Sequence, residues 1–223
     1  MTVPQQSVCR VYHKPLDVRN ALTEFNIPKS YIVDAAQAGF VERLNATVHD
    51  PVTAAGTDAW RYAVRSFRSA LDELGWRQDD PKNLPLSIND ELRVSVTVSS
   101  GDRDTGKVYG KPKTKNPKGA LFDAAIARNT RQPDLFPDLL PEAIREFSNT
   151  VSYKTWVLLI FISETEIRAE LSLPSSMDHA DRLCEWSERI IIDVPLPDEE
   201  KVHDDVNDDD DKDDFLDKIR PKF

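Results

Sequence analysis

The residues best suited to chemistry lie in one loop, residues 101–119, which follows a strand-like segment. The loop opens with the pattern Gly-x-x-x-x-Gly-Lys, the spacing of a loop that cradles nucleotide phosphates. The next residue is Val108, which has no hydroxyl group to bind a magnesium ion. Gly110 and Pro112 prevent a helix from starting there, so the loop lacks the helix dipole that binds phosphate. The sequence therefore argues against a nucleotide-binding P-loop.

The second half of the same loop carries a dense positive charge. It holds five lysines and no acidic residue, and we predict these lysines as nucleic-acid or phosphate contacts: Lys107, Lys111, Lys113, Lys115 and Lys118. Glycines and prolines predict an extended, mobile loop, which suits contact with a polyanion through counterion release, with Tyr109 as a stacking surface. Two other interpretations stay open. The lysines only keep an exposed loop soluble, or they meet the acidic tail of the same chain.

The chain offers little for metal or histidine chemistry. Its four histidines lie far apart, and no His-x-His, His-Glu-x-x-His or Cys-x-x-Cys pattern occurs, which argues against a zinc site. His179 lies between Asp178 and Asp181, but a charge relay needs groups from separate elements, so a surface turn is favoured. Cys9 and Cys184 allow at most one disulfide, and we expect a reduced chain with Cys184 as a packing residue. No cofactor, metal ligand or catalytic residue is predicted.

One pair of carboxylates leaves an enzymatic alternative open. Glu166 and Glu170 are four residues apart in a predicted strand, so both point to the same face, with Arg168 between them. Such a pair, with Asp134 as a third ligand, would hold magnesium for phosphodiester cleavage. A nuclease of this kind requires a lysine at the position of Arg168, and arginine does not replace it. Ion pairing on a solvated sheet face explains the same residues without any catalytic role.

Negative charge is concentrated at the C-terminal end of the chain. Residues 198–223 hold twelve acidic and five basic side chains, a net charge of −7 out of −10, which leaves −3 for the rest. This composition predicts a disordered tail, and no EF-hand fits, because Asp210 and Leu216 stand where glycine and glutamate are needed. The tail is interpreted as a solubilising segment or as a phosphate-backbone mimic that occupies a basic groove of a partner. Its last residues are predicted to dock on a protein partner through Phe215, Leu216, Ile219 and Phe223.

Length and composition describe a soluble globular protein. The chain has 223 residues, of which 39% are hydrophobic and 30% charged. The longest apolar run, residues 156–162, has the length of a strand and falls well short of the roughly 18 residues of a membrane helix. The first residues lack the charged and apolar regions of a secretory signal, so we expect a cytoplasmic protein without membrane contact.

Several segments have the spacing of helices. The clearest is residues 57–74, after which Gly75 is expected to end the helix in the left-handed conformation. Its apolar stripe consists of Trp60, Ala63, Val64, Phe67, Leu71 and Leu74. A helix over residues 30–48 is expected to start at Ser30 and to bury Val33, Ala36, Phe40, Leu44 and Val48. Shorter helices are expected over residues 16–25, 119–128 and 142–147.

Four later segments have the pattern of strands. Residues 92–98 alternate between apolar and polar side chains, with Leu92, Val94, Val96 and Val98 pointing inward. Residues 155–162 are continuously apolar and predict a central strand, paired as a hairpin with residues 167–173. A last strand is expected over residues 189–194.

Because helices come first and strands mostly later, the sequence predicts an α+β fold, with an antiparallel sheet of about four strands and helices packed on one face. Residues 1–197 are expected to form this single domain, followed by the acidic low-complexity tail, residues 198–223. We predict a non-enzymatic binding protein, an accessory, inhibitor or adaptor subunit, that acts on a larger, nucleic-acid-handling partner through the acidic arm. The alternative is a nucleic-acid-binding or metal-dependent phosphodiester-acting enzyme that uses the lysine-rich loop, residues 107–118.

Overall fold

The computed structural model describes residues 9–130 and 153–197. Some predictions fall outside these ranges: the helix over residues 142–147, Asp134 as a metal ligand, and the tail with its docking residues Phe215, Leu216, Ile219 and Phe223. They stay predictions.

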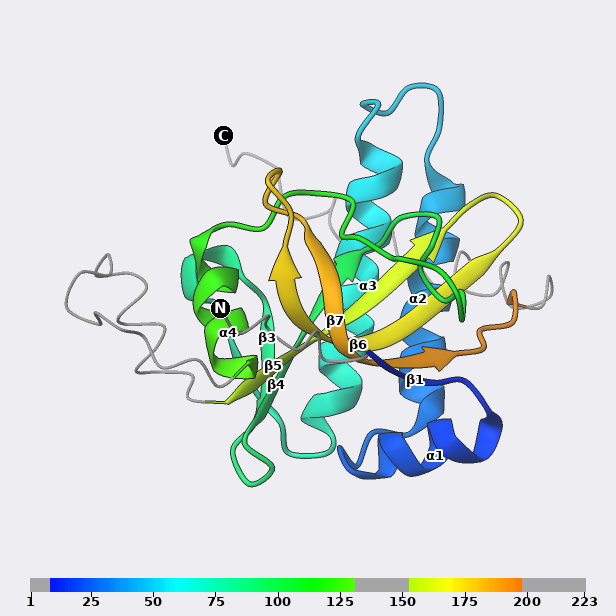
Figure 1. Ribbon diagram of the computed structural model, residues 1–223. Coiled ribbons are helices and arrows are strands. Elements are labelled where there is room, and N and C mark those ends of the chain that lie inside the picture. The colour runs from blue at the N-terminus through cyan, green and yellow to red at the C-terminus, as the bar shows by residue number, and fades with distance from the viewer. Residues whose placement is uncertain (1–8, 131–152, 198–223) are drawn as a thin grey trace, which may run out of the picture.

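A seven-stranded mixed sheet runs through the described part of the chain (Figure 1), with the strand order β1-β7-β6-β5-β4-β3-β2. Two neighbouring pairs are parallel, β4 with β5 and β1 with β7, and the other four pairs are antiparallel. The strands are β1 (Arg10–Tyr12), β2 (Arg77–Asp79), β3 (Leu86–Asn89), β4 (Val94–Ser100), β5 (Lys154–Ile162), β6 (Ile167–Met177) and β7 (Leu183–Ile192).

Helices cover both faces of this sheet. The described helices are α1 (Pro15–Thr23), α2 (Lys29–Asn45), α3 (Ala54–Asp72) and α4 (Ala120–Asn129). Alternation along β5 explains the two layers, because Trp156, Leu158 and Ile160 join the core under α1, α2 and α3, whereas Val157 and Leu159 join the core under α4. Since β5 is covered on both faces, its sequence is continuously apolar.

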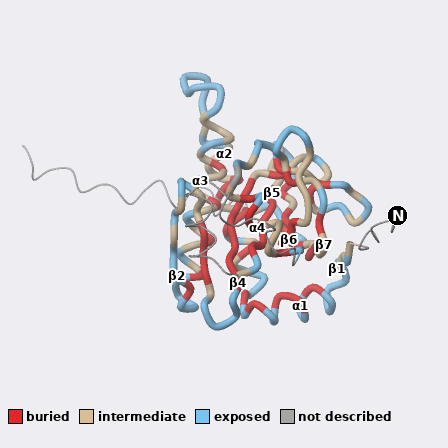
Figure 2. Tube along the Cα trace, turned by 60° about the vertical axis from the view of Figure 1, so that its left-hand side comes forward, coloured by how far each residue is buried: buried red, intermediate tan, exposed pale blue. Residues whose placement is uncertain are grey.

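The larger core lies between the sheet and the first three helices. Phe67 and Leu71 of α3 and Ile32 of α2 are almost completely inaccessible to water. The rings of Phe25 and Trp156 meet edge to face, with centroids 4.9 Å apart, which joins the end of α1 to the middle of the sheet. The connection between α2 and α3 projects from the body and is exposed (Figure 2). The same two helices form one wall of a surface cleft.

A single buried amide fixes α4 on the other face. The side chain of Asn129 donates to the carbonyl oxygens of Thr155 and Pro174 and accepts the backbone N–H of Thr155, each at 3.0 Å. Because these contacts reach both β5 and β6, the end of α4 has a defined position on the sheet.

The α+β class is confirmed, but the predicted sheet is wrong in size and direction. β1, β2 and β3 have only three or four residues each, too few to show a period of two. β4 and β5 are parallel, whereas an antiparallel sheet was predicted. α4 packs on the face opposite α1, α2 and α3, which contradicts the prediction that helices cover one face only. β7 begins at Leu183, earlier than predicted, and the prediction missed its first half because Glu185 and Ser187 give that part a polar pattern.

The helix over residues 57–74 is confirmed as α3, and Gly75 follows with φ +77°. The helix over residues 30–48 is confirmed as α2, but it ends at Asn45, so Leu44 and Val48 are exposed. Ser30 is the second residue of α2 rather than its N-cap. Among the residues described, no helix is both long and apolar enough to cross a lipid bilayer.

Candidate anion-binding cleft

A cleft opens at the carboxyl ends of the two parallel strands. It is lined by Ser99 and Ser100 at the end of β4, by Phe161 and Ile162 at the end of β5, and by Trp60 of α3. Ligands of α/β sheets bind outside the carboxyl ends of parallel strands, because the connections that leave those ends diverge and keep a crevice open. The parallel pairing of β4 and β5 therefore creates a place for a ligand.

Cationic side chains from two distant parts of the chain line this cleft. Arg43 comes from the last turn of α2, and Arg103 and Lys115 come from the loop over residues 101–119. Within the described ranges, none of the three forms an ion pair. The one acidic residue among the lining residues is Asp102, whose Oδ1 accepts the backbone N–H of Asp104 at 3.0 Å. The cleft therefore has an excess of positive charge.

The cleft continues over the first turn of α3. Here Thr53, Gly56 and Thr57 line it together with Arg43 and Lys115. This turn holds no acidic residue, and the N-cap residue makes no side-chain hydrogen bond, so the positive end of the helix dipole adds to the charge of the side chains. Gly56 leaves the backbone bare, because a Cβ atom there would meet nothing within 4 Å.

We call these two adjoining hollows, of about 300 and 620 Å³, the anion cleft. They share five lining residues: Arg43, Gly56, Trp60, Ser100 and Lys115. The indole Nε1 of Trp60 donates to the carbonyl oxygen of Val98 at 3.0 Å, which fixes the ring beside the end of β4. Lys115 is fixed there as well, because its backbone N–H donates to the carbonyl oxygen of Ser100 at 2.9 Å.

The lysine-rich loop, which was predicted to be extended and mobile, is attached to the sheet by hydrogen bonds. In Figure 1 it runs from the end of β4 across β6 and β7 towards α4. The guanidinium group of Arg189 donates to the carbonyl oxygens of Lys107 and Gly110, each at 3.0 Å. Farther along the loop, Trp186 Nε1 donates to the carbonyl oxygen of Pro112 at 2.9 Å. Side chains of β7 therefore replace the hydrogen bonds that a free loop would make with water.

A buried ion pair forms the centre of this attachment. Glu170 of β6 is fully buried, and Arg189 beside it is 3% exposed. Arg189 Nε lies 3.1 Å from one carboxylate oxygen of Glu170, and its Nη2 lies 2.5 Å from the other. The Ser172 hydroxyl and the Gly106 backbone N–H also donate to this carboxylate, both at 2.9 Å. Every oxygen of Glu170 is thus satisfied inside the protein, as a buried charge requires.

This arrangement corrects the interpretation of the two carboxylates. Glu166 is exposed and lies 3.4 Å from Arg168, whereas Glu170 is covered by the loop and paired with Arg189. The two carboxylates therefore do not form a solvated row that could hold magnesium. Across the described ranges, no group of three or more His, Cys, Asp or Glu side chains is placed to hold a metal ion.

The five lysines predicted to contact nucleic acid or phosphate do not lie together in the structure. Lys113 pairs with Asp178 at 3.0 Å, and Lys107 lies 3.9 Å from Asp104. The side chain of Lys111 is exposed and lines none of the hollows described here. The remaining two, Lys115 and Lys118, line the anion cleft.

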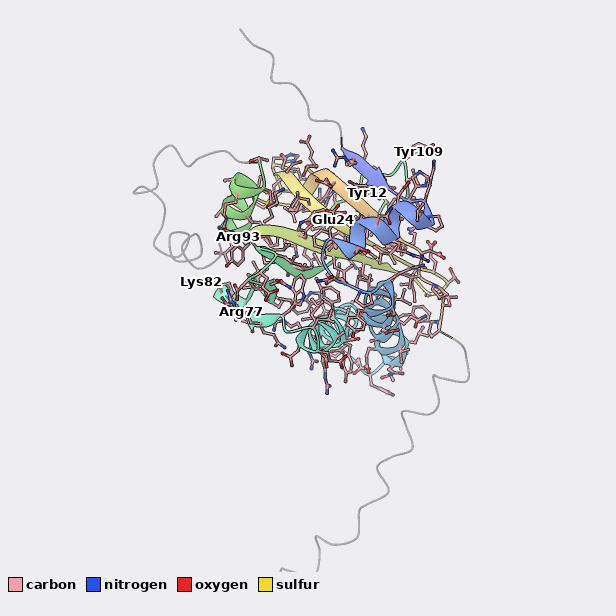
Figure 3. All side chains as sticks on the ribbon, turned by 90° about the horizontal axis from the view of Figure 1, so that it is seen from below. Tyr12, Glu24, Arg77, Lys82, Arg93 and Tyr109 are labelled. Atoms are coloured by element: carbon pink, nitrogen blue, oxygen red, sulfur yellow. The ribbon has the colours of Figure 1, made fainter. Side chains whose placement is uncertain are left out.

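The predicted stacking residue does not line the cleft. Tyr109 is 97% exposed and lies on the opposite side of the molecule from Lys82 (Figure 3). Trp60 is the aromatic side chain that lines the cleft itself.

The segment around His179 is an ordinary turn between β6 and β7, as predicted. Asp178 Oδ1 accepts the backbone N–H groups of Ala180 and Arg182, at 3.0 and 3.1 Å. The hydrogen bond from Lys113, followed by these backbone donors, holds the pKa of the Asp178 carboxyl well below its usual range. An ionised Asp178 therefore ties the lysine-rich loop to this turn, while His179 is exposed.

The two cysteines are not activated. Cys9 and Cys184 are both free, and burial raises the pKa of each thiol. A raised pKa keeps the thiol protonated near neutral pH, which agrees with a packing role and argues against a nucleophile.

Sequence reasoning missed Arg43 and assigned Trp60 to packing alone. Neither residue lies near the lysine-rich loop in the sequence, and no local pattern distinguishes Arg43 from other helix-surface cations. The sequence does place Arg43 and Trp60 on two consecutive helices, and the structure brings both residues to the end of β4.

Comparison of this chain with protein-family models, with curated proteins and with solved structures gives no match. The geometry of the cleft is therefore what indicates its function.

Proposed function

We propose that the protein is a non-enzymatic binding protein that takes single-stranded nucleic acid into the anion cleft. The observation that supports this most directly is that Arg43, Lys115 and Lys118 line one cleft without an ion-pair partner among the described residues. A low-dielectric cleft lined by one sign of charge concentrates ligands of the opposite sign, and phosphates release counterions when they bind such cations.

A single strand suits the cleft better than a duplex. Trp60 lines both hollows of the cleft, and its ring is fixed by the hydrogen bond to Val98. A base contacts the face of an aromatic ring only when it is unpaired, and such stacking tolerates any sequence. Because two of the four cations that line the cleft, Lys115 and Lys118, are flexible lysines, we expect binding that depends on charge more than on base identity.

Charge reversal in the cleft tests this proposal. At about 50 mM salt, Arg43→Glu and Lys115→Glu are each expected to weaken binding of a labelled single-stranded oligonucleotide about tenfold, because each removes one released counterion and adds a repulsion. Each variant should also reduce the slope of log affinity against log salt by about one. Fluorescence anisotropy over a salt series measures both quantities.

Lys111→Glu is the matched control, since it changes the same charge in the same loop at a side chain that lines none of the hollows. We expect it to change the affinity about twofold or less. Equal losses in Lys111→Glu and Lys115→Glu would mean that net charge, and not the cleft, governs binding. An absence of wild-type binding at low salt would refute the proposal outright.

The acidic arm supports a second candidate function, binding to a larger partner that itself handles nucleic acid. The observation in its favour is the charge partition, −7 in residues 198–223 against −3 in the rest of the chain. An acidic segment of this kind can occupy a basic groove, and the apolar residues Phe215, Leu216, Ile219 and Phe223 can anchor it there.

Removal of residues 198–223 tests the arm separately. We expect the truncated chain to lose its partner in a pull-down from native cells while its thermal midpoint stays unchanged, because an acidic, low-complexity composition predicts a segment that adds nothing to a hydrophobic core. Recovery of the same partner by the truncated chain would reject this function without affecting the proposal for the cleft.

A further inference from the structure

A third hollow of about 460 Å³ adjoins the anion cleft. It lies between β4, the segment that precedes β3, and the segment that leads into α4. Its walls are mainly apolar and include Trp60, Leu84, Pro85, Leu121 and Phe122. Trp60 and Lys118 also line the anion cleft, so the two spaces are adjacent. We call this space the side hollow. Its volume lies within the range of sites that bind small organic groups.

A residue in the wall of the side hollow has an unsatisfied hydroxyl group. Thr97 of β4 is 2% exposed and lines the hollow, and its Oγ1 has no hydrogen-bond partner among the described residues. Buried polar groups in proteins are nearly always hydrogen-bonded, so an exception inside a cavity points to a partner that arrives with a ligand. The neighbouring hydroxyl on the same face of β4, Ser95, is satisfied by Thr155 at 3.0 Å.

Lys118 lies at the junction of the side hollow and the anion cleft. Its backbone N–H donates to the carbonyl oxygen of Asp181 at 2.6 Å, which fixes the position of the residue. Burial lowers the pKa of its ammonium group, and no described carboxylate forms an ion pair with it to offset this effect. An anion at the junction would favour the charged form and so offset the effect of burial on the pKa.

The opposite wall contains strained backbone. Lys82 and Asn83 both have positive φ values, 49° and 63°, although neither is glycine. Both residues line the side hollow. Consecutive left-handed residues are costly, and such strain gathers where a binding surface needs a particular shape.

We propose that the side hollow takes one base of the bound strand, with the Thr97 hydroxyl hydrogen-bonded to the edge of the base and Lys118 in contact with its phosphate. A base has two apolar faces and a polar edge, which matches apolar walls with one unpaired hydroxyl group. The phosphates on either side of this base then lie in the anion cleft with Lys115 and Arg43. This inference rests on the proposed function and adds that one base leaves the stack to enter a pocket.

Abasic oligonucleotides test the inference. Wild-type protein is expected to bind a strand that has all its bases about tenfold more tightly than the same strand with abasic sites throughout its central part, because the base contacts add to the phosphate contacts. Thr97→Val keeps the shape of the side chain and removes the hydroxyl. It should weaken binding of the complete strand about fivefold and leave binding of the abasic strand unchanged.

Thr105→Val is the matched control. Thr105 is also fully buried with an unpaired hydroxyl, but it does not line the side hollow. We expect no change in affinity for either strand. Leu121→Trp, which fills the side hollow from the side of α4, is expected to bring the affinity for the complete strand down to that for the abasic strand.

The outcomes separate the two proposals. If wild-type protein binds both strands equally, and Lys115→Glu weakens both, the base pocket is wrong and the anion cleft stands. If wild-type protein binds neither strand at low salt, the cleft and the pocket both fail. If Thr105→Val reproduces the effect of Thr97→Val, the effect comes from the fold, and the role of Thr97 is refuted. Thermal unfolding of each variant shows that it is folded.

Discussion

Arg189→Met is expected to lower the free energy of unfolding by about 3–5 kcal/mol, because it leaves the Glu170 carboxylate buried without its cation. Glu170 is fully buried and would retain only Ser172 and Gly106 as donors. The variant also loses the two hydrogen bonds from Arg189 to the carbonyl oxygens of the lysine-rich loop. Urea unfolding of the wild type and the variant measures the difference.

Two further variants show whether the buried charge is the cause. Arg61→Met removes an exposed cation that pairs with Asp58 at 2.8 Å, and its effect should stay within about 1 kcal/mol. The double variant Glu170→Leu with Arg189→Met should be more stable than Arg189→Met alone, because no unpaired charge remains in the interior. A loss below about 1 kcal/mol for Arg189→Met would contradict the argument.

The same pair positions the binding surface. The lysine-rich loop leaves β4 at the anion cleft, crosses over Glu170 and Arg189, and returns with Lys115 and Lys118 to the cleft. A loop without this attachment would place the two lysines in many positions, and the entropy of ordering them would oppose binding. In the proposed function, the buried ion pair would support binding by holding the loop that carries Lys115 and Lys118.

Gly39→Val is expected to lower the free energy of unfolding by about 3 kcal/mol, because α2 and α3 meet at this residue backbone to backbone. A Cβ atom on Gly39 would lie 2.6 Å from the carbonyl oxygen of Ala59, and 3.3 Å from side-chain atoms of Ala63 and Ile162. No rotamer avoids contact with a backbone atom, so the two helices must separate. Urea unfolding again gives the measurement, and an unchanged midpoint would show that the helices can move apart freely.

Gly56→Ala is the control for Gly39→Val, since it adds a methyl group to the same helix pair where nothing lies within 4 Å. Alanine has the higher helix propensity, so this variant should gain up to about 1 kcal/mol. Opposite signs for the two variants would show that the close approach of α2 and α3, and not the loss of glycine, is responsible.

The lysine-rich loop shows how much of the site the sequence predicts. Its five lysines and the absence of acids were evident in the sequence, and two of them line the cleft. The sequence could not show which of the five lysines line the cleft. Lys113, for example, is neutralised by Asp178, a residue 65 positions away. Arg43 was missed for the converse reason, since its partners in the cleft come from a different part of the chain.

The carboxylates give the same lesson. Glu166 and Glu170 are four residues apart in the sequence, a spacing that predicts two side chains on one face of a strand. Only the tertiary structure covers Glu170 with the lysine-rich loop and brings Arg189 of the adjacent strand beside it. Burial and pairing of a charge depend on what lies across the sheet, which local periodicity does not encode.

The sequence by itself determined the α+β class, α3 with its stop at Gly75, the buried strand β5, and the concentration of charge in one loop and one tail. These features depend on spacing within a single segment. The tertiary structure alone decided that β4 and β5 are parallel, and this direction creates the cleft. It also decided which cations share that cleft, because strand order and loop attachment are set by contacts between residues far apart in the chain.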